Sequence, residues 1–139
     1  MKIENHKIEL RTRGFCDIHD LTPEAHRKIE TSKVKNGQVT FFVVGSTAGI
    51  TTVEYEPGLI KDLKVVFEKL APENGRYYHE DTWHDGNGFS HVRASLLKPS
   101  LSVPLVNGEM TLGTWQQVIL IDFDNTPRSR QVVLQIMGE

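Results

Sequence analysis

The sequence is short of cysteine and of long apolar segments. Its single cysteine, Cys16, has no partner for an internal disulfide, so a reducing, cytoplasmic location is the default expectation. We expect Cys16 to be a small packed side chain rather than a nucleophile. No apolar run approaches the roughly 20 residues of a membrane helix, and residues 1–10 lack the apolar stretch of a signal peptide. These absences predict a protein with no membrane partner.

An excess of charge of one sign is also absent. The chain has 16 Lys and Arg residues against 18 Asp and Glu residues, which gives a formal net charge of −2. Nucleic-acid-binding domains need clustered positive charge, so we expect no nucleic-acid partner. The 139 residues suit one domain with one core. No repeat or long linker divides them, and we therefore predict a single domain over residues 1–139.

Strand patterns occur in both halves of the chain. Residues 2–12 alternate in part, and residues 50–55 are rich in Thr, Ile and Val. The run QVTFFVVG at 38–45 is apolar, β-branched and aromatic, which predicts a central strand buried on both faces. After residue 87 the pattern is strand-like to the end, and SHVRASLL at 90–97 is predicted to be the first of these strands.

The C-terminal strands are expected to form hairpins. Asn107 and Gly108 tolerate the positive φ angles of a tight turn between two strands. The runs at 115–123 and 130–137 are predicted to pair with each other around a turn at 124–128.

Two helices are predicted between the strands of the first half. The first covers about 23–33, because Thr22 suits the N-cap and Pro23 the first helical position. The second begins after Pro57 and shows the apolar spacing of an amphipathic helix until Pro72. A polar loop should follow. The expected fold is therefore α+β: one compact domain with two main helices and seven or eight strands in mostly antiparallel sheets.

The segment YYHEDTWHDGNGFSHVRA contains three of the six histidines, His79, His84 and His91, among several carboxylates. Imidazoles and carboxylates that converge on one point can hold a metal ion, and Asp81 and Asp85 could orient the imidazoles. An imidazole-rich site favours zinc or another transition ion over magnesium. The spacing is looser than a known zinc signature, so a solvated loop is the alternative interpretation.

Other polar residues have weaker patterns. Glu54 lies at the end of a predicted strand, where functional groups gather, although an exposed edge acid is the plainer interpretation. Arg93, Arg128 and Arg130 have the planar guanidinium that grips phosphate, but arginines on strands are more often surface residues. In GTWQ at 113–116, the aromatic Trp115 is large enough to anchor a core or an interface.

Together these motifs resemble the YjbQ-like family, also called the secondary thiamine-phosphate synthase family. The resemblance covers nearly the whole chain, and the combination of NGxxH, GTWQ and the C-terminal PRxR is its most specific part. The matching pieces, in order, are RGF at 13–15, Ser46–Thr47 with Thr51-Thr52-x-Glu54, Pro57, Asp62, YYH at 77–79, SHVRAS at 90–95, GTWQ at 113–116 and the closing arginines.

The resemblance implies a small α+β domain that assembles as a homotrimer, with a polar pocket near the subunit contacts. It also implies an enzyme for a small phosphorylated metabolite. The family name points to weak thiamine-phosphate synthase activity, in which a pyrimidine diphosphate and a thiazole phosphate give thiamine phosphate and pyrophosphate. We expect His91 and Glu54 to be catalytic, His79, His84 and His91 to hold any divalent metal, and Arg93, Arg130, Thr114 and Gln116 to bind substrate.

Two alternatives remain open at this stage. Pyrophosphate chemistry usually runs with magnesium, whereas the histidines favour a transition ion. A metal-assisted hydrolase of a phosphorylated metabolite is therefore a second enzymatic possibility. A trimeric protein that binds an anion or a metal without catalysis is the third.

Overall fold

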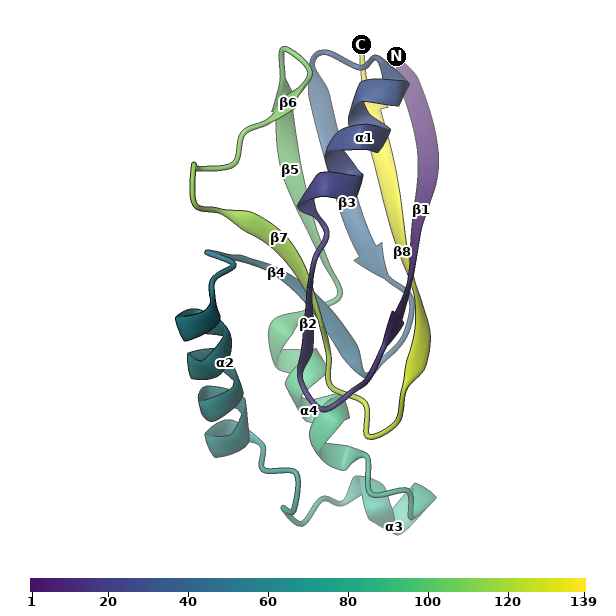
Figure 1. Ribbon diagram of the computed structural model, residues 1–139. Helices are drawn as coiled ribbons and strands as arrows, with labels where there is room; N and C mark the ends of the chain where they lie inside the picture. Colours follow the sequence, from purple (N-terminus) through teal and green to yellow (C-terminus); the bar gives the residue numbers. More distant parts are fainter.

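The computed structural model describes all residues from 1 to 139 and contains two antiparallel sheets and four helices (Figure 1). The larger sheet has the strand order β1-β8-β3-β5-β6, and the smaller has the order β2-β7-β4. The strands are β1 (Lys2–Thr12), β2 (Asp17–Asp20), β3 (Gly37–Val43), β4 (Ala48–Val53), β5 (Ser100–Val106), β6 (Glu109–Met110), β7 (Gln117–Asp122) and β8 (Arg128–Gly138). The helices are α1 (Thr22–Ser32), α2 (Pro57–Leu70), α3 (His79–Trp83) and α4 (Gly88–Leu97). The α+β class, the eight strands and the antiparallel pairing confirm the prediction.

The core has two parts, one on each side of the small sheet. The first lies between α1 and the inner face of the large sheet, and Val118 and Leu120 of β7 belong to it. The second lies on the other face of β7, where Ile119 and Ile121 pack against residues of α2 and α4. Strand β7 is thus buried on both faces, and its position between two layers explains its unbroken apolar run.

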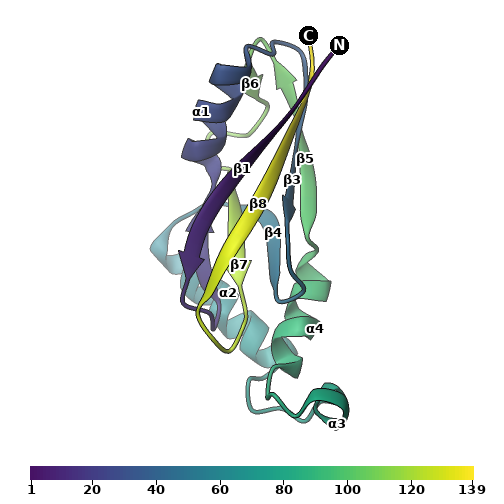
Figure 2. The same ribbon diagram turned by 90° about the vertical axis from the view of Figure 1, so that its right-hand side faces the viewer.

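Strand β3 was predicted to be buried on both faces, and this prediction is wrong. Val39, Phe41 and Val43 are fully buried, but Phe42 between them is 46% exposed. The strand is central in its sheet, between β8 and β5. No helix covers the face of that sheet turned away from α1 (Figure 2), so every second side chain of β3 points outward.

Residues 90–97 were predicted to be a strand, and the structure shows that they belong to helix α4. The residues buried in α4 include Phe89, Ser90, Arg93 and Ala94, which share one helical face. Val92 and Leu96 of the same helix are exposed although they are apolar. The short helix α3 also interrupts the loop predicted at 72–87.

The two last strands do not pair with each other, contrary to the prediction. Strand β7 pairs with β2 and β4, whereas β8 pairs with β1 and β3. Residues 123–127 carry the chain from one sheet to the other. The hairpin turn at Asn107 and Gly108 is confirmed, since both residues have positive φ and join β5 to β6.

The termini and the helices α3 and α4 lie at opposite ends of the molecule (Figure 1). At one end, the amino group of Met1 is 3.7 Å from Glu139 Oε1. At the other end, β4 begins, β7 ends and the connection to β8 passes close to α4 (Figure 2). None of the four helices is long and apolar enough to cross a bilayer.

Candidate metal centre

Two of the three loop histidines meet at the end formed by α3 and α4. His79 is the first residue of α3, and His91 lies in the second turn of α4. Their ring centroids are 4.4 Å apart, with the rings tilted by 40°. The fold therefore brings together the two imidazoles that the sequence had singled out, although twelve positions separate them in the chain.

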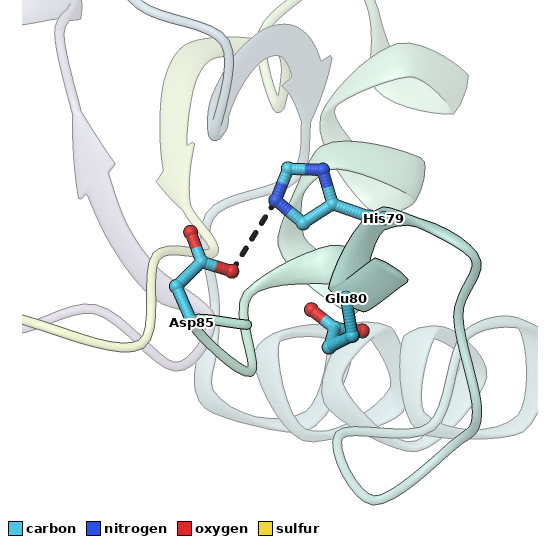
Figure 3. Close-up of side chains that lie close together, drawn as sticks. All are labelled: His79, Glu80 and Asp85. Atoms are coloured by element: carbon cyan, nitrogen blue, oxygen red, sulfur yellow. Dashed lines mark ion pairs between the residues drawn. The ribbon is translucent and has the colours of Figure 1, made fainter. Parts of the chain in front are cut away.

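His79 faces carboxylates on its other side. Its Nε2 atom is 3.3 Å from Asp85 Oδ1 (Figure 3), but this contact lacks the direction of a hydrogen bond, and Nε2 is buried without a hydrogen-bond partner. His79, Glu80 and Asp85 can each place one ligand atom within 4.8 Å of the other two. A buried imidazole nitrogen that lies beside carboxylates without a well-directed hydrogen bond is a feature that a bound cation would explain.

The NGxxH motif at 87–91 positions the carboxylates and the imidazoles of this group. The Asn87 amide N–H donates to Asp85 Oδ1 at 3.0 Å and so fixes the carboxylate that faces His79. The Gly88 N–H donates to Glu80 Oε1 at 3.1 Å, which ties α3 to the first turn of α4. A Cβ atom on Gly88 would lie 2.5 Å from Tyr77 Cβ, so only glycine lets the start of α4 approach the segment before α3 this closely. One turn later, the His91 amide N–H donates to the Asn87 carbonyl oxygen.

His91 is electrostatically suited to act as a neutral base or ligand. Burial lowers the pKa of its imidazole, and the neighbouring His79 lowers it further, against the opposing effect of Asp85, Asp124 and Glu80. At neutral pH the ring is therefore uncharged and keeps one nitrogen lone pair. For Asp85, the hydrogen bond from the Asn87 N–H is the main reason that the pKa of the carboxyl lies below its usual value.

A buried network of polar side chains around Asp124 holds the start of α4 in place. Asp124 Oδ2 accepts hydrogen bonds from Thr47 Oγ1 at 2.8 Å and from Asn87 Nδ2 at 3.2 Å. Burial alone would raise the pKa of Asp124, but the hydrogen bonds from Thr47 and Thr126 and the contact with Arg128 outweigh it, and the pKa falls to about 2. Asp124 is therefore a permanent anion that anchors Asn87, and through it the start of α4.

The third histidine of the loop is placed differently. His84 is exposed and ends α3 in a left-handed conformation, with φ of 55°. It is not in the group of residues whose ligand atoms converge. The structure brings Glu80 and Asp85 to His79, whereas the sequence had pointed to His84.

Glu54, Thr114 and Gln116 lie at the other end of the small sheet. Gln116 Nε2 donates to Thr52 Oγ1 at 3.0 Å, next to the point where Val53 pairs with Gln117. The histidines lie near the opposite end of β4, where Ala48 pairs with Asp122. At roughly 3.3 Å per residue, the length of β4 separates the two groups by about 17 Å. Within one chain, these three residues and the histidines form two separate groups.

Arg93 and Arg130, expected to bind substrate, are engaged within the fold. The Arg93 side chain is buried between Phe89 and Phe123, and it donates to the Ala71 carbonyl and to Glu68, each at 2.9 Å. Arg130 makes a two-point hydrogen bond to Asp122, at 2.6 and 3.0 Å, and donates to Thr47. These contacts link elements of the core.

Sequence reasoning missed Asn87 and Asp124. Asn87 belongs to the quoted NGxxH motif but carries no chemistry of its own, so its role as an anchor was invisible. Asp124 lies two positions after the end of the buried strand β7. A carboxylate at the end of a buried strand is a recognised signal, and it was applied to Glu54 but not to Asp124.

Comparisons with known proteins agree with this architecture. Residues 6–139 match the family model described as "UPF0047 protein YjbQ-like". A UPF0047 protein of Methanothermobacter thermautotrophicus is 33% identical over 139 residues, which cover 100% of this chain and 95% of that protein. A UPF0047 protein of Synechocystis is 34% identical over 123 residues, covering 88% of this chain and 84% of that protein.

Solved structures give the same result. A structure from Sulfolobus solfataricus, described as a YbjQ-like protein of unknown function, superposes with a TM-score of 0.94 at 28% identity and covers 99% of each chain. A yjbq/upf0047 family structure from Clostridium acetobutylicum has a TM-score of 0.86 at 32% identity, covering 95% of this chain and 99% of that one. On the family model, the sequence relatives and the fold, the chain belongs to the YjbQ-like family, UPF0047.

Proposed function

We propose that the protein is a metal-dependent enzyme that hydrolyses a small phosphorylated metabolite in the cytoplasm. The observation that carries this proposal is the buried Nε2 atom of His79, which lies 3.3 Å from Asp85 Oδ1 without a well-directed hydrogen bond. Asp85 and Glu80 supply carboxylate oxygens, and His91 adds a neutral imidazole beside them. Two imidazoles with carboxylates suit zinc or another transition ion better than magnesium.

Each residue has a defined role in this proposal. His79, Asp85 and Glu80 would hold the ion, which when bound supplies a Lewis acid for a phosphoryl oxygen and for water. His91, neutral at pH 7, either completes the ligand set or accepts a proton from the attacking water. Asn87 holds Asp85 through its N–H and Asp124 through its side-chain amide, so it keeps the ligand geometry in place.

Hydrolysis is favoured over thiamine-phosphate formation for one structural reason. Formation of thiamine phosphate releases pyrophosphate, whose charge needs cationic groups. Arg93 and Arg130 were expected to supply them, but both donate hydrogen bonds within the fold, to Glu68, Ala71, Asp122 and Thr47. A single half-exposed arginine, Arg128, is left beside Asp124, which suits one phosphoryl group better than pyrophosphate.

The test is metal binding followed by turnover. Zinc titrated into metal-free protein should bind at one site, and His79→Ala and Asp85→Ala should each weaken binding by more than about tenfold, since even outer-shell changes cost about 10–100-fold. His26→Ala is a matched control, because His26 lies near a carboxylate as well, 3.8 Å from Glu109 Oε2, but on α1. Release of phosphate from a panel of phosphomonoesters should then require zinc and His79. Wild-type zinc affinity in His79→Ala would contradict the proposal.

We also propose that the chain self-associates, as a homotrimer on the family resemblance. The outward positions of β8, β3 and β5 support this, because none of them is charged. They are Ser129, Gln131, Val133, Gln135 and Met137 of β8, Gln38, Thr40 and Phe42 of β3, and Ser100, Ser102, Pro104 and Val106 of β5. An exposed face without charge can pack against a copy of itself without like-charge repulsion.

Self-association would also give a role to the second group of expected site residues. Trp115 is 71% exposed next to Thr114 and Gln116, which suits a subunit contact. Glu54, Thr114 and Gln116 would then reach a histidine pair only from a neighbouring subunit. Light scattering should give a trimer mass for the wild type. Phe42→Glu should lower that mass, whereas Val65→Glu on α2 should not, although both side chains are about half exposed. A monomeric wild type would contradict this.

A further inference from the structure

One arginine at the histidine end keeps both of its terminal amino groups free. The guanidinium of Arg128 is half exposed and pairs through Nε with Asp124 Oδ2 at 3.1 Å. Its two terminal amino groups make no hydrogen bond within the chain, whereas Arg93 and Arg130 each use Nε and one terminal amino group for bonds to Glu68, Ala71, Asp122 and Thr47. We propose that Arg128 is the anion-binding residue of the site, which holds the phosphoryl group of the substrate. This assignment rests on the proposed function.

The position of Arg128 follows from a short chain of contacts. Asp124 Oδ2 faces Arg128 on one side and accepts the Asn87 side-chain amide on the other, at 3.2 Å. Asn87 in turn donates its backbone N–H to Asp85, the carboxylate beside His79. Asn87 thus hydrogen-bonds both to Asp124, which pairs with Arg128, and to Asp85, which faces His79.

The geometry of Arg128 suits a phosphoryl group. Asp124 contacts Nε of the guanidinium, and the two terminal amino groups have no hydrogen-bond partner within the chain. A guanidinium that is held on one side offers two parallel donors to two oxygens of one phosphate, and little side-chain entropy remains to be lost. Thr126 hydrogen-bonds to Asp124 Oδ1 through both its N–H and its hydroxyl, at 3.0 and 2.9 Å, so the carboxylate itself is fixed.

The local charge makes anion binding depend on the metal. Glu80, Asp85, Asp122 and Asp124 contribute four negative charges, and Arg128 and Arg130 contribute two positive ones. Two net negative charges remain in the metal-free protein, and a divalent cation cancels them. An anion should therefore be repelled from the metal-free site and attracted once the ion is bound.

Phenylphosphonate, which cannot be hydrolysed at phosphorus, is a suitable probe for calorimetric titration. Zinc-loaded wild-type protein should bind it, and metal-free protein should bind it much more weakly. Arg128→Ala should lose about tenfold or more in phosphonate affinity, the usual worth of a charged hydrogen bond. Arg128→Lys should fall between the two, because lysine lacks the paired donors. Zinc affinity should remain unchanged in both variants.

Arg11→Ala is the matched control. Arg11 is an exposed arginine that pairs with Ser129, next to Arg128, and alternation places its side chain on the opposite face of the sheet. Its loss should leave phosphonate affinity unchanged. The assignment is overturned if Arg128→Ala binds phosphonate as the wild type does, if Arg11→Ala loses affinity equally, or if the wild type binds none. Failure of the wild type to bind zinc would instead overturn the proposed function, whereas zinc binding without an effect of Arg128→Ala on phosphonate affinity would overturn only the assignment of Arg128.

Discussion

Two pairs of a basic side chain with a carboxylate lie near the same end of the molecule: Arg130 with Asp122, and His79 with Asp85. They differ in how many of their polar atoms make hydrogen bonds. Arg130 and Asp122 are almost completely buried, and they share two hydrogen bonds, at 2.6 and 3.0 Å. Thr12 and Thr47 bond to the same pair. His79 and Asp85 are partly exposed, 3.3 Å apart, and the buried nitrogen of His79 has no hydrogen-bond partner.

The difference separates groups that hold the fold together from groups that are ready for a ligand. A buried charge pair whose two ions hydrogen-bond to each other and to neighbouring hydroxyls has little capacity left for a substrate. An unsatisfied buried nitrogen costs free energy in the folded protein unless something else pairs with it. Arg130 was expected to bind phosphate on its residue type alone, and the comparison with His79 shows why residue type is a poor guide without the partners.

The largest effect should come from breaking the satisfied pair. Asp122→Ala leaves the Arg130 guanidinium buried without its carboxylate, and we expect a loss of about 3–5 kcal/mol in the free energy of unfolding. Urea titration measures this as a lower midpoint at unchanged slope. The double variant Asp122→Leu with Arg130→Met should recover most of the loss, because no charge is left unpaired. Equal instability of the double and single variants would mean that the charge pair is not the cause.

A smaller effect, confined to acid pH, should come from Asp124. The pKa of its carboxyl is about 2, below the ordinary value of 3.8. Because the folded-state pKa is depressed, the stabilisation is fully present above the ordinary pKa and is lost as the pH falls through about 2. The difference corresponds to about 2 kcal/mol.

Asp124→Asn tests this acid dependence, since an amide keeps the shape of the side chain but does not titrate in this range. Urea midpoints measured from pH 6 down to about 2 should fall less steeply in Asp124→Asn than in the wild type. Asp62→Asn is a control on the exposed surface of α2, and its acid dependence should follow that of the wild type. Parallel curves for Asp124→Asn and the wild type would show that another group governs acid unfolding.

The elements of the fold differ in how well the sequence predicted them. The strands of the large sheet and the helices α1 and α2 followed from local patterns, because apolar periodicity, Pro23 and the Asn107–Gly108 turn act within a few residues. Helix α4 was mistaken for a strand, and its apolar Val92 and Leu96 do not mark the buried face, because both are exposed. Their exposure depends on what packs around α4, which no local pattern contains.

The site was predicted in part for a similar reason. His79 and His91 were found from residue type and from the family motifs, and the fold brings their rings within 4.4 Å. The partners of each side chain could not be predicted, because they come from segments far apart in the chain. Asn87, for example, bonds to Asp124 across 37 positions. The same kind of long-range contact occupies Arg93 and Arg130, which is why residue type misjudged them.

The smallest effect is expected from His79 in the metal-free protein, and it is the sharpest test of the comparison. His79→Leu removes a buried nitrogen that has no hydrogen-bond partner, so its loss should change the free energy of unfolding by less than about 1 kcal/mol. Zinc at 100 times its dissociation constant should stabilise the wild type by about 2.7 kcal/mol and the variant hardly at all. If His79→Leu were as unstable as Asp122→Ala without metal, His79 would be a structural group. The distinction between the His79–Asp85 pair and the Arg130–Asp122 pair would then disappear, because a nitrogen that already stabilises the fold is not a free ligand for a cation.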